Sequence, residues 1–167
     1  MSIKKIIKRV LSIYFTLLVK KRVKSYILPL RVNRFSVVSA NTILGKNVNF
    51  NGIRISGKGE VLIGDNFHSG RNCLILSEIH NYDFGVKVPY DETCIIKPVK
   101  VEDNVWLGDR VIILGGVTIG EGAIIQAGSV VVKDIPKYAI AGGHPAKVFS
   151  SRDVRHYELL KEQEKFH

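Results

Sequence analysis

Aliphatic residues recur at every sixth position along the second half of the chain. From residue 101 onward, the blocks VEDNVW, LGDRVI, ILGGVT, IGEGAI, IQAGSV and VVKDIP each begin with Val, Leu or Ile, and the residue four places later is small or aliphatic. A helix with about 3.6 residues per turn would not keep these positions on one face over the six blocks. The period instead predicts a solenoid, because each block supplies one short strand and one corner.

The repeat favours a triangular parallel β-helix, in which three blocks form one coil of about 18 residues. Inward aliphatic side chains would stack on those of the next coil, while Gly, Asn and Asp would occupy corners that need a positive φ angle. We expect such corners at Asp103-Asn104, Gly115-Gly116 and Glu121-Gly122. Upstream, the same period starts at Val38 and then slips by one residue.

A segment without the repeat interrupts this pattern between His80 and Ile95. Its sequence, NYDFGVKVPYDETC, carries aromatic and acidic side chains and directly follows a histidine. Loops on rigid scaffolds often carry functional residues. We therefore expect residues 81–94 to form a functional loop that leaves the solenoid.

Basic residues are concentrated at the front of the chain. Of 25 Lys and Arg residues, ten lie before residue 35, where there are no acidic residues; the body is therefore neutral, which argues against a nucleic-acid partner. Residues 10–19 are apolar, but about 20 such residues are needed to span a bilayer. We expect residues 1–34 to form a basic helical segment. It either contacts the inner membrane surface peripherally or packs on its own domain or a neighbouring subunit.

The remaining features complete the expected organisation. Cys73 and Cys94 give neither a disulfide framework nor a metal-binding spacing, and no obvious cleavage site follows the apolar stretch, so a cytoplasmic protein with reduced thiols is expected. We expect three parts: the helical segment over 1–34, an all-β parallel β-helix over 35–142, and a C-terminal turn and short helix over 143–167.

Three segments resemble the hexapeptide-repeat acyltransferases, namely residues 64–75, 80–120 and 124–148. Within this family the sequence is most similar to bacterial sugar and surface-polysaccharide O-acetyltransferases, which are related to the maltose, galactoside and streptogramin acetyltransferases. The resemblance implies a left-handed solenoid and a homotrimer with active sites between subunits. It also implies acetyl coenzyme A (acetyl-CoA) as co-substrate, with no metal required.

The resemblance also implies roles for individual residues. His80 matches the family's catalytic histidine, and an imidazole that titrates near neutrality suits a general base. Tyr82 and Asp83 would bind a sugar hydroxyl or simply order the loop, and His68 could also reach the acceptor. Trp106 would wall the thioester site or cover the trimer contact. The full set implied for coenzyme A is Trp106, Gly108, Ala127, Gly128, Val132, Lys133 and Lys147.

The sequence thus predicts an acetyl-CoA-dependent O-acetyltransferase of a sugar or glycan. Two alternatives stay open: N-acetylation of a nucleotide-linked amino sugar, and a non-catalytic solenoid scaffold. The coincidence of His80, the loop and the segment AGGHPAK at residues 141–147 favours the enzyme. No cluster of His and Cys with ligand spacing indicates a metal site.

Overall fold

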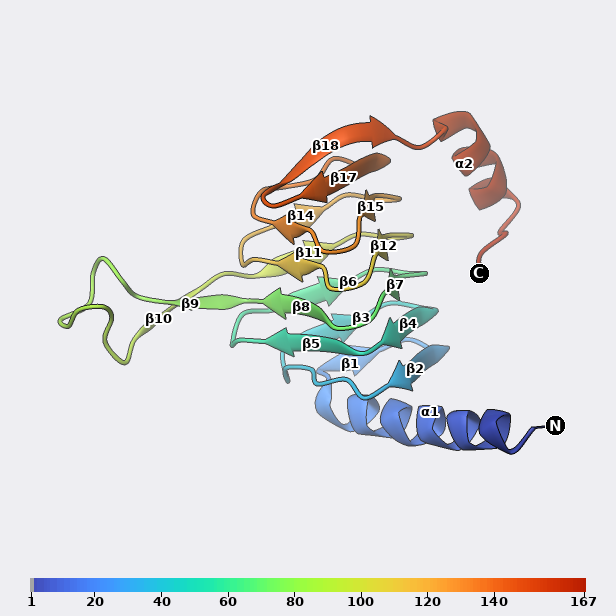
Figure 1. Cartoon of the computed structure of the whole chain (residues 1–167), viewed down its shortest axis with the longest axis horizontal. Coiled ribbons are helices and arrows are strands. Elements are labelled where there is room, and N and C mark those ends of the chain that lie inside the picture. Colours follow the sequence, from blue (N-terminus) through green and yellow to red (C-terminus); the bar gives the residue numbers. More distant parts are fainter. Residues whose placement is uncertain (1) are drawn as a thin grey trace.

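The computed structural model describes residues 2–167 and shows a parallel β-solenoid of about six turns with a helix at each end (Figure 1). Helix α1 (Ile3–Arg22) lies across one end of the solenoid, and the shorter α2 (Val154–Glu162) lies near the other. A long hairpin projects sideways from the middle of the stack. The two helices and this hairpin are the main departures from the regular coils.

Three sheets form the faces of the solenoid, here named A, B and C. Neighbouring strands are parallel throughout, except that the last two strands of face B are antiparallel. Face A consists of β1 (Ser25–Tyr26), β3 (Thr42–Leu44), β6 (Val61–Ile63), β11 (Val99–Val101) and β14 (Thr118–Ile119). Face B consists of β2 (Leu30–Arg34), β4 (Val48–Asn51), β7 (His68–Ser69), β12 (Trp106–Leu107), β15 (Ile124–Ile125), β17 (Ala139–Gly143) and β18 (Ala146–Ser151). Face C consists of β5 (Ile53–Ser56), β8 (Cys73–Leu76), β13 (Ile112–Ile113) and β16 (Val130–Val131).

The strand register confirms the hexapeptide period. From β11, β12 and β13 to the next coil each residue pairs with the one 18 positions further on, as Trp106 does with Ile124, whereas at the last coil the step is 16, as between Ile124 and Ile140. From β1 to β3 the step is also 18, but from β3 and β5 to the next coil it is longer by one or two residues; Leu44, for example, pairs with Ile63. The upstream slip in the sequence pattern therefore corresponds to slightly longer corners.

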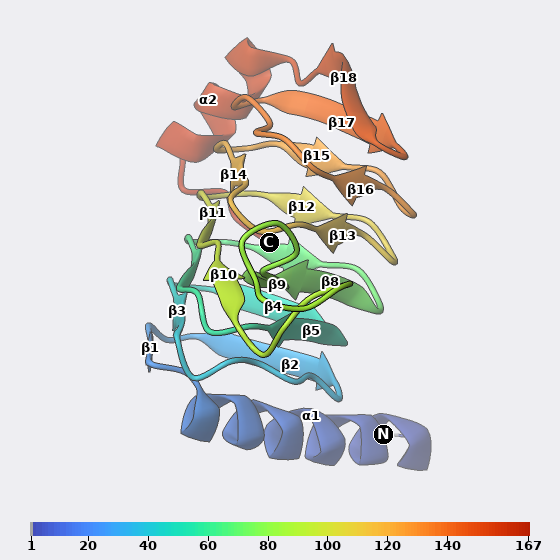
Figure 2. The ribbon, with the colours of Figure 1, turned by 90° about the vertical axis from the view of Figure 1, so that its left-hand side faces the viewer.

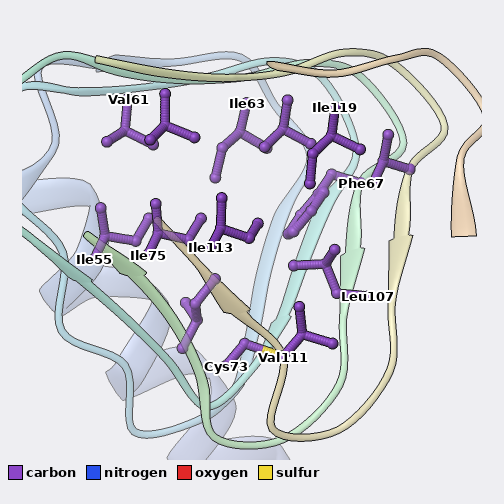
Figure 3. Close-up of a cluster of buried hydrophobic side chains, with 14 of the residues drawn as sticks. Ile55, Val61, Ile63, Phe67, Cys73, Ile75, Leu107, Val111, Ile113 and Ile119 are labelled. Carbon is purple, nitrogen blue, oxygen red and sulfur yellow. The ribbon is translucent and has the colours of Figure 1, made fainter. Parts of the chain in front are cut away.

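Aliphatic side chains at the predicted inward positions fill the interior. Ile63, Ile75 and Leu107 are fully buried and point inward from faces A, C and B respectively (Figure 3). The residue four places after each block start is buried as well, including Ser129, whose hydroxyl donates to the Gln126 carbonyl at 2.8 Å. Each buried aliphatic side chain stabilises the fold by about 1.5–3 kcal/mol relative to an exposed one.

The corners have the backbone conformation expected from their residue types. Asn104, Gly116 and Gly122 have φ angles of 59°, 87° and 69°. Asparagine side chains also bond from coil to coil, because Asn47 donates to Asn66 at 2.9 Å and Asn66 donates to Asn104 at 3.0 Å. The corners thus add polar contacts along the stack.

Helix α1 closes one end of the solenoid through a narrow face. Val19 is buried, and the Thr16 hydroxyl accepts a 3.0 Å hydrogen bond from the Val32 amide. The helix ends at Arg22 rather than near residue 34. The difference arises because Leu30 and Val32 point into the core while their strand, β2, pairs with β4 as part of the first coil.

The C-terminal segment contains a strand in addition to the expected turn and helix. After the turn at residues 144–145, β18 runs back along β17, and α2 follows with Asp153 as its N-cap. The Asp153 carboxylate accepts a 3.0 Å bond from the His156 amide, which satisfies one free donor of the first helical turn. The antiparallel pair of β17 and β18 covers the last coil.

Candidate active site

The interruption of the repeat forms a hairpin that leaves the solenoid directly after β8. Its strands β9 (Glu78–His80) and β10 (Cys94–Ile96) are antiparallel, and the loop between them extends away from the coils (Figures 1 and 2). Across this insertion Val101 pairs with Ile63, 38 positions earlier. Ile79 stands four places after the buried Ile75, but it is 44% exposed because the chain has already left the coil.

His80 is the last residue of β9, and its side chain is exposed. Its ring stacks on that of Tyr90 with a centroid distance of 3.9 Å and an interplanar angle of 13°. Its Nδ1 lies 4.0 Å from the Sγ of Cys94, the residue opposite it in the hairpin. No hydrogen bond within residues 2–167 occupies Nε2. That nitrogen is therefore available to accept a proton from a bound molecule.

Asp91 orders the loop from within. Its buried carboxylate accepts hydrogen bonds from the Val86 amide at 2.9 Å, the Thr93 amide at 2.8 Å and the Thr93 hydroxyl at 2.5 Å. These bonds, above all that from the Thr93 hydroxyl, hold the pKa of Asp91 below its ordinary value. Gly85 lies against this carboxylate, and a Cβ there would be 2.9 Å from the Asp91 Cγ.

Tyr82 and Asp83 are exposed, and the structure does not bring them onto the imidazole. In the described part of the chain, neither residue stacks on His80 or shares a hydrogen bond with it. The aromatic neighbour is Tyr90, which sequence reasoning did not assign. Tyr90 lies in the loop before β10, whose first residue, Cys94, is the register partner of His80. Only the path of this loop brings the Tyr90 ring onto His80, so the linear sequence carries little signal for the contact.

Four of the residues expected to bind coenzyme A lie at the corner between faces B and C. Gly108 follows β12, and a Cβ on it would lie 2.5 Å from the amide nitrogen of Ala127 in the next coil. Gly128 has a φ angle of 74°, with no atom within 4 Å of its Cβ position. Lys147 pairs with Gly142 at the same end of face B. Gly108 therefore has a packing role, whereas the surface at Gly128 is accessible.

The other expected cofactor residues lie elsewhere. Val132 and Lys133 are exposed and follow β16, at the edge where the His80 hairpin leaves face C after β8. Trp106 is 52% exposed on face B. In a single chain, the seven residues are thus distributed over two edges and one face.

His68 and Trp106 are neighbours in register on face B, and both line a cavity of about 810 Å³ between this face and α2. The His68 ring lies 5.0 Å from that of His167. Burial, followed by the charge of His167, lowers the pKa of His68. His80 does not line this cavity. His68 and His80 therefore belong to different surfaces of one chain.

The described residues 2–167 contain no group of three or more His, Cys, Asp or Glu side chains that could hold a metal ion. Both cysteines are free. Cys73 is buried in the core, and burial raises the pKa of its thiol. Its Sγ lies 3.2 Å from the Gly108 carbonyl, which gives it a structural place in the coil.

Comparison with known proteins agrees with the fold. Residues 98–133 match the family described as bacterial transferase hexapeptide (six repeats). A relative from Schizosaccharomyces pombe, provisionally named an acetyltransferase, is 45% identical over 87 residues, which are 52% of this chain and 41% of the relative. The chain spans about half, or less, of the length of the curated relatives that it matches first.

Solved structures of acetyltransferases share the architecture. A maltose O-acetyltransferase from Clostridium difficile 630 is 31% identical with a TM-score of 0.60, covering 77% of this chain and 66% of that one. A hexapeptide-repeat acetyltransferase from Vibrio cholerae O1 biovar eltor, complexed with acetyl-CoA, is 26% identical with a TM-score of 0.64, covering 81% and 74%. A galactoside acetyltransferase in complex with coenzyme A is 26% identical with a TM-score of 0.64, covering 92% and 83%. Residues 98–133 therefore carry the hexapeptide repeat of bacterial transferases, and the chain is similar in structure to these acetyltransferases.

Proposed function

We propose that this protein is an acetyl-CoA-dependent O-acetyltransferase whose acceptor is a hydroxyl of a sugar or surface polysaccharide. The observation that carries the proposal is the placement of His80 at the root of the hairpin, with its ring stacked on Tyr90 and its Nε2 unoccupied within the described chain. The similarity to a maltose O-acetyltransferase and a galactoside acetyltransferase supports the reaction type.

His80 is the general base in this proposal. Its Nε2 takes the proton of the acceptor hydroxyl while the hydroxyl oxygen attacks the thioester carbonyl carbon. The new C–O bond gives a tetrahedral oxyanion, which a backbone N–H group would stabilise. Collapse of this intermediate breaks the C–S bond, and the departing sulfur of coenzyme A receives the proton from the imidazolium. The products are the acetyl ester and free coenzyme A.

A homotrimer would complete the site. His80 is exposed in the single chain, and the loop beyond it carries three strongly exposed apolar side chains: Phe84, Val86 and Val88. Exposed apolar clusters of this kind mark contact surfaces. In the trimer the loop would pack on a neighbouring solenoid, excluding water from the thioester.

The proposed ligands are divided between the two sides of this contact. Coenzyme A would lie along the edges that carry Gly128 and Lys133, with the cations of Lys133 and Lys147 near its phosphates. The acceptor would meet Tyr82 and Asp83 on the loop. His68, on face B, could join this site only through a neighbouring subunit, because it lies on a different surface from its own chain's His80.

The test is thiol release from acetyl-CoA over a panel of hydroxyl sugars, nucleotide-linked amino sugars and serine. His80→Ala should lower turnover by about 10²–10⁴-fold. His156→Ala, which removes an exposed histidine from α2, is the matched control and should retain turnover.

The outcomes separate the candidate functions. Turnover restricted to hydroxyl sugars and lost in His80→Ala supports the proposal. Turnover only with amino sugars moves the function to N-acetylation. A protein that neither binds acetyl-CoA nor releases thiol with any acceptor contradicts the enzyme and favours a scaffold, while full turnover in His80→Ala contradicts the assignment of the base.

A further inference from the structure

Helix α1 carries an apolar stripe that faces away from the solenoid. Eight of its large apolar side chains are at least 43% exposed, whereas Thr16 and Val19 are buried against the first coil. The exposed positions follow the three- and four-residue spacing of a single helical face. They are Ile3, Ile6, Ile7, Val10, Leu11, Ile13, Tyr14 and Leu17. In Figure 1 the side of the helix opposite β2 contacts nothing else in the molecule.

Basic side chains border this stripe on both edges. The helix contains seven Lys and Arg residues and no acidic residue. Arg9 lies one turn from Ile6 and from Ile13 along one edge, and Lys4 lies one turn from Ile7 along the other. None of the ion pairs found among residues 2–167 involves a cation of α1. These charges are therefore available to an external anionic partner.

Several of the cations converge on a groove. The groove has a volume of about 550 Å³ and lies between α1 and β2. It is lined by Lys8, Arg9 and Lys20 from the helix and by Arg31 from the strand, with no acidic side chain. Ile13 and Leu17 of the apolar stripe line the same groove. Positive charge and apolar surface thus lie side by side. This arrangement is complementary to a lipid, in which an anionic headgroup lies above apolar acyl chains.

We propose that α1 docks on an anionic lipid bilayer, with its stripe among the upper acyl-chain segments and its basic edges on the headgroup phosphates. Neither helix of the described chain is long and apolar enough to cross a membrane, so the helix lies in the surface. Pairing of α1 with its copy would bring two cationic, acid-free helices together, whereas anionic lipid neutralises them. A nucleic acid would leave the eight apolar side chains in water.

The experiment is flotation of the full chain with vesicles of phosphatidylcholine alone or mixed with phosphatidylglycerol. The wild type should float with the mixture and much less with phosphatidylcholine, and added salt should weaken binding. Val10→Ser/Leu17→Ser should lower the partition constant at least about tenfold. Lys8→Gln/Arg9→Gln should lower it about fivefold for each cation removed.

The matched control is Val154→Ser/Leu159→Ser, which replaces two exposed apolar residues of α2 and should bind vesicles like the wild type. Absence of wild-type flotation, equal binding to both vesicle types, or undiminished binding by the stripe variant overturns the proposal. Loss of a lipid-free oligomer in Val10→Ser/Leu17→Ser, seen by sedimentation velocity, would instead identify a second copy as the occupant and also overturn it. Circular dichroism establishes that each variant is folded.

Discussion

His80 owes its orientation to residues that lie far along the chain. The ring of Tyr90 covers one face of the imidazole, and the Sγ of Cys94 faces its Nδ1, so the nitrogen left for chemistry is Nε2. Near-parallel stacking at 3.9 Å restricts rotation of the imidazole plane. Tyr90 is therefore a positioning residue in the proposed reaction rather than a catalytic one.

Removing the ring of Tyr90 should reduce the proposed activity without abolishing it. We expect Tyr90→Ala to lower kcat several-fold with little change in the KM for acetyl-CoA, because the base is present but less well oriented. Tyr90→Phe keeps the stacked ring and should restore kcat. Steady-state thiol-release kinetics measure both variants, and a Phe variant as slow as the Ala variant would contradict the positioning role.

A core substitution tests the inward positions of the repeat. Ile113 is fully buried, whereas its neighbour Ile112 is partly exposed on the outer side of the same strand. Ile113→Ala should lower the free energy of unfolding by about 2–5 kcal/mol, since it leaves a cavity between coils. Ile112→Ala should cost clearly less. Denaturant unfolding compares the two variants, and equal losses would show that the assignment of inward and outward positions is wrong.

The hairpin from Glu78 to Ile96 is the element that departs from the solenoid, and the carboxylate of Asp91 accepts three of the hydrogen bonds within it. Asp91 accepts three hydrogen bonds from Val86 and Thr93, and Gly85 leaves room for it. The ion pair between Lys87 and Glu92 lies on the exposed side of the same loop. Exposed pairs contribute little, so of the two acidic residues Asp91 stabilises the loop more than Glu92 does.

Loop order should depend on pH through Asp91. Because its folded-state pKa is lowered, the carboxylate stabilises the loop above the unfolded-state value of about 3.9, and this contribution is lost as the pH falls through the folded-state pKa. Asp91→Ala should open the loop already at neutral pH, and Glu92→Ala should not. Amide hydrogen exchange at Val86 and Thr93 measures the opening. Unchanged protection of these amides in Asp91→Ala would contradict the assignment.

At the scale of the whole molecule, the exposed loop residues and the exposed His80 indicate a surface that a neighbouring subunit would cover. Val88 is 98% exposed and Val86 is 88% exposed in the single chain. Helix α1 lies at the end of the stack, away from the hairpin (Figure 1). In a trimer of parallel solenoids, three such helices would lie at the same end, so trimerisation and the proposed membrane contact are compatible.

The native mass should be three times that of one chain. Phe84→Ser/Val86→Ser should shift the protein toward smaller species and lower its activity, because the loop would lose apolar contacts with the neighbouring solenoid. Light scattering coupled to gel filtration measures the mass. A wild type that is monomeric at micromolar concentration, or a loop variant that keeps the wild-type mass, would contradict the proposed trimer contact.

The repeat was readable from the sequence because its physical cause is local and periodic. A strand of the coil buries every second residue, and each corner needs a conformation that Gly, Asn or Asp adopts readily. The burial of Val101, Leu107 and Ile113 and the positive φ angles of Asn104 and Gly116 therefore follow from the sequence pattern. The pattern does not locate the end of the first helix, which is Arg22 and not residue 34, because Leu30 and Val32 form a strand only by pairing with the next coil.

The coils, the corners, the position of the inserted loop and the basic apolar character of the N-terminal segment all follow from the sequence. Three further features emerge only in the folded chain: Tyr90 stacks on His80, His68 and Trp106 share a separate cavity, and the stripe of α1 faces outward. Periodic burial is encoded by neighbouring residues, whereas these contacts depend on the path of the loop, on the register between coils and on which face of a helix meets the core.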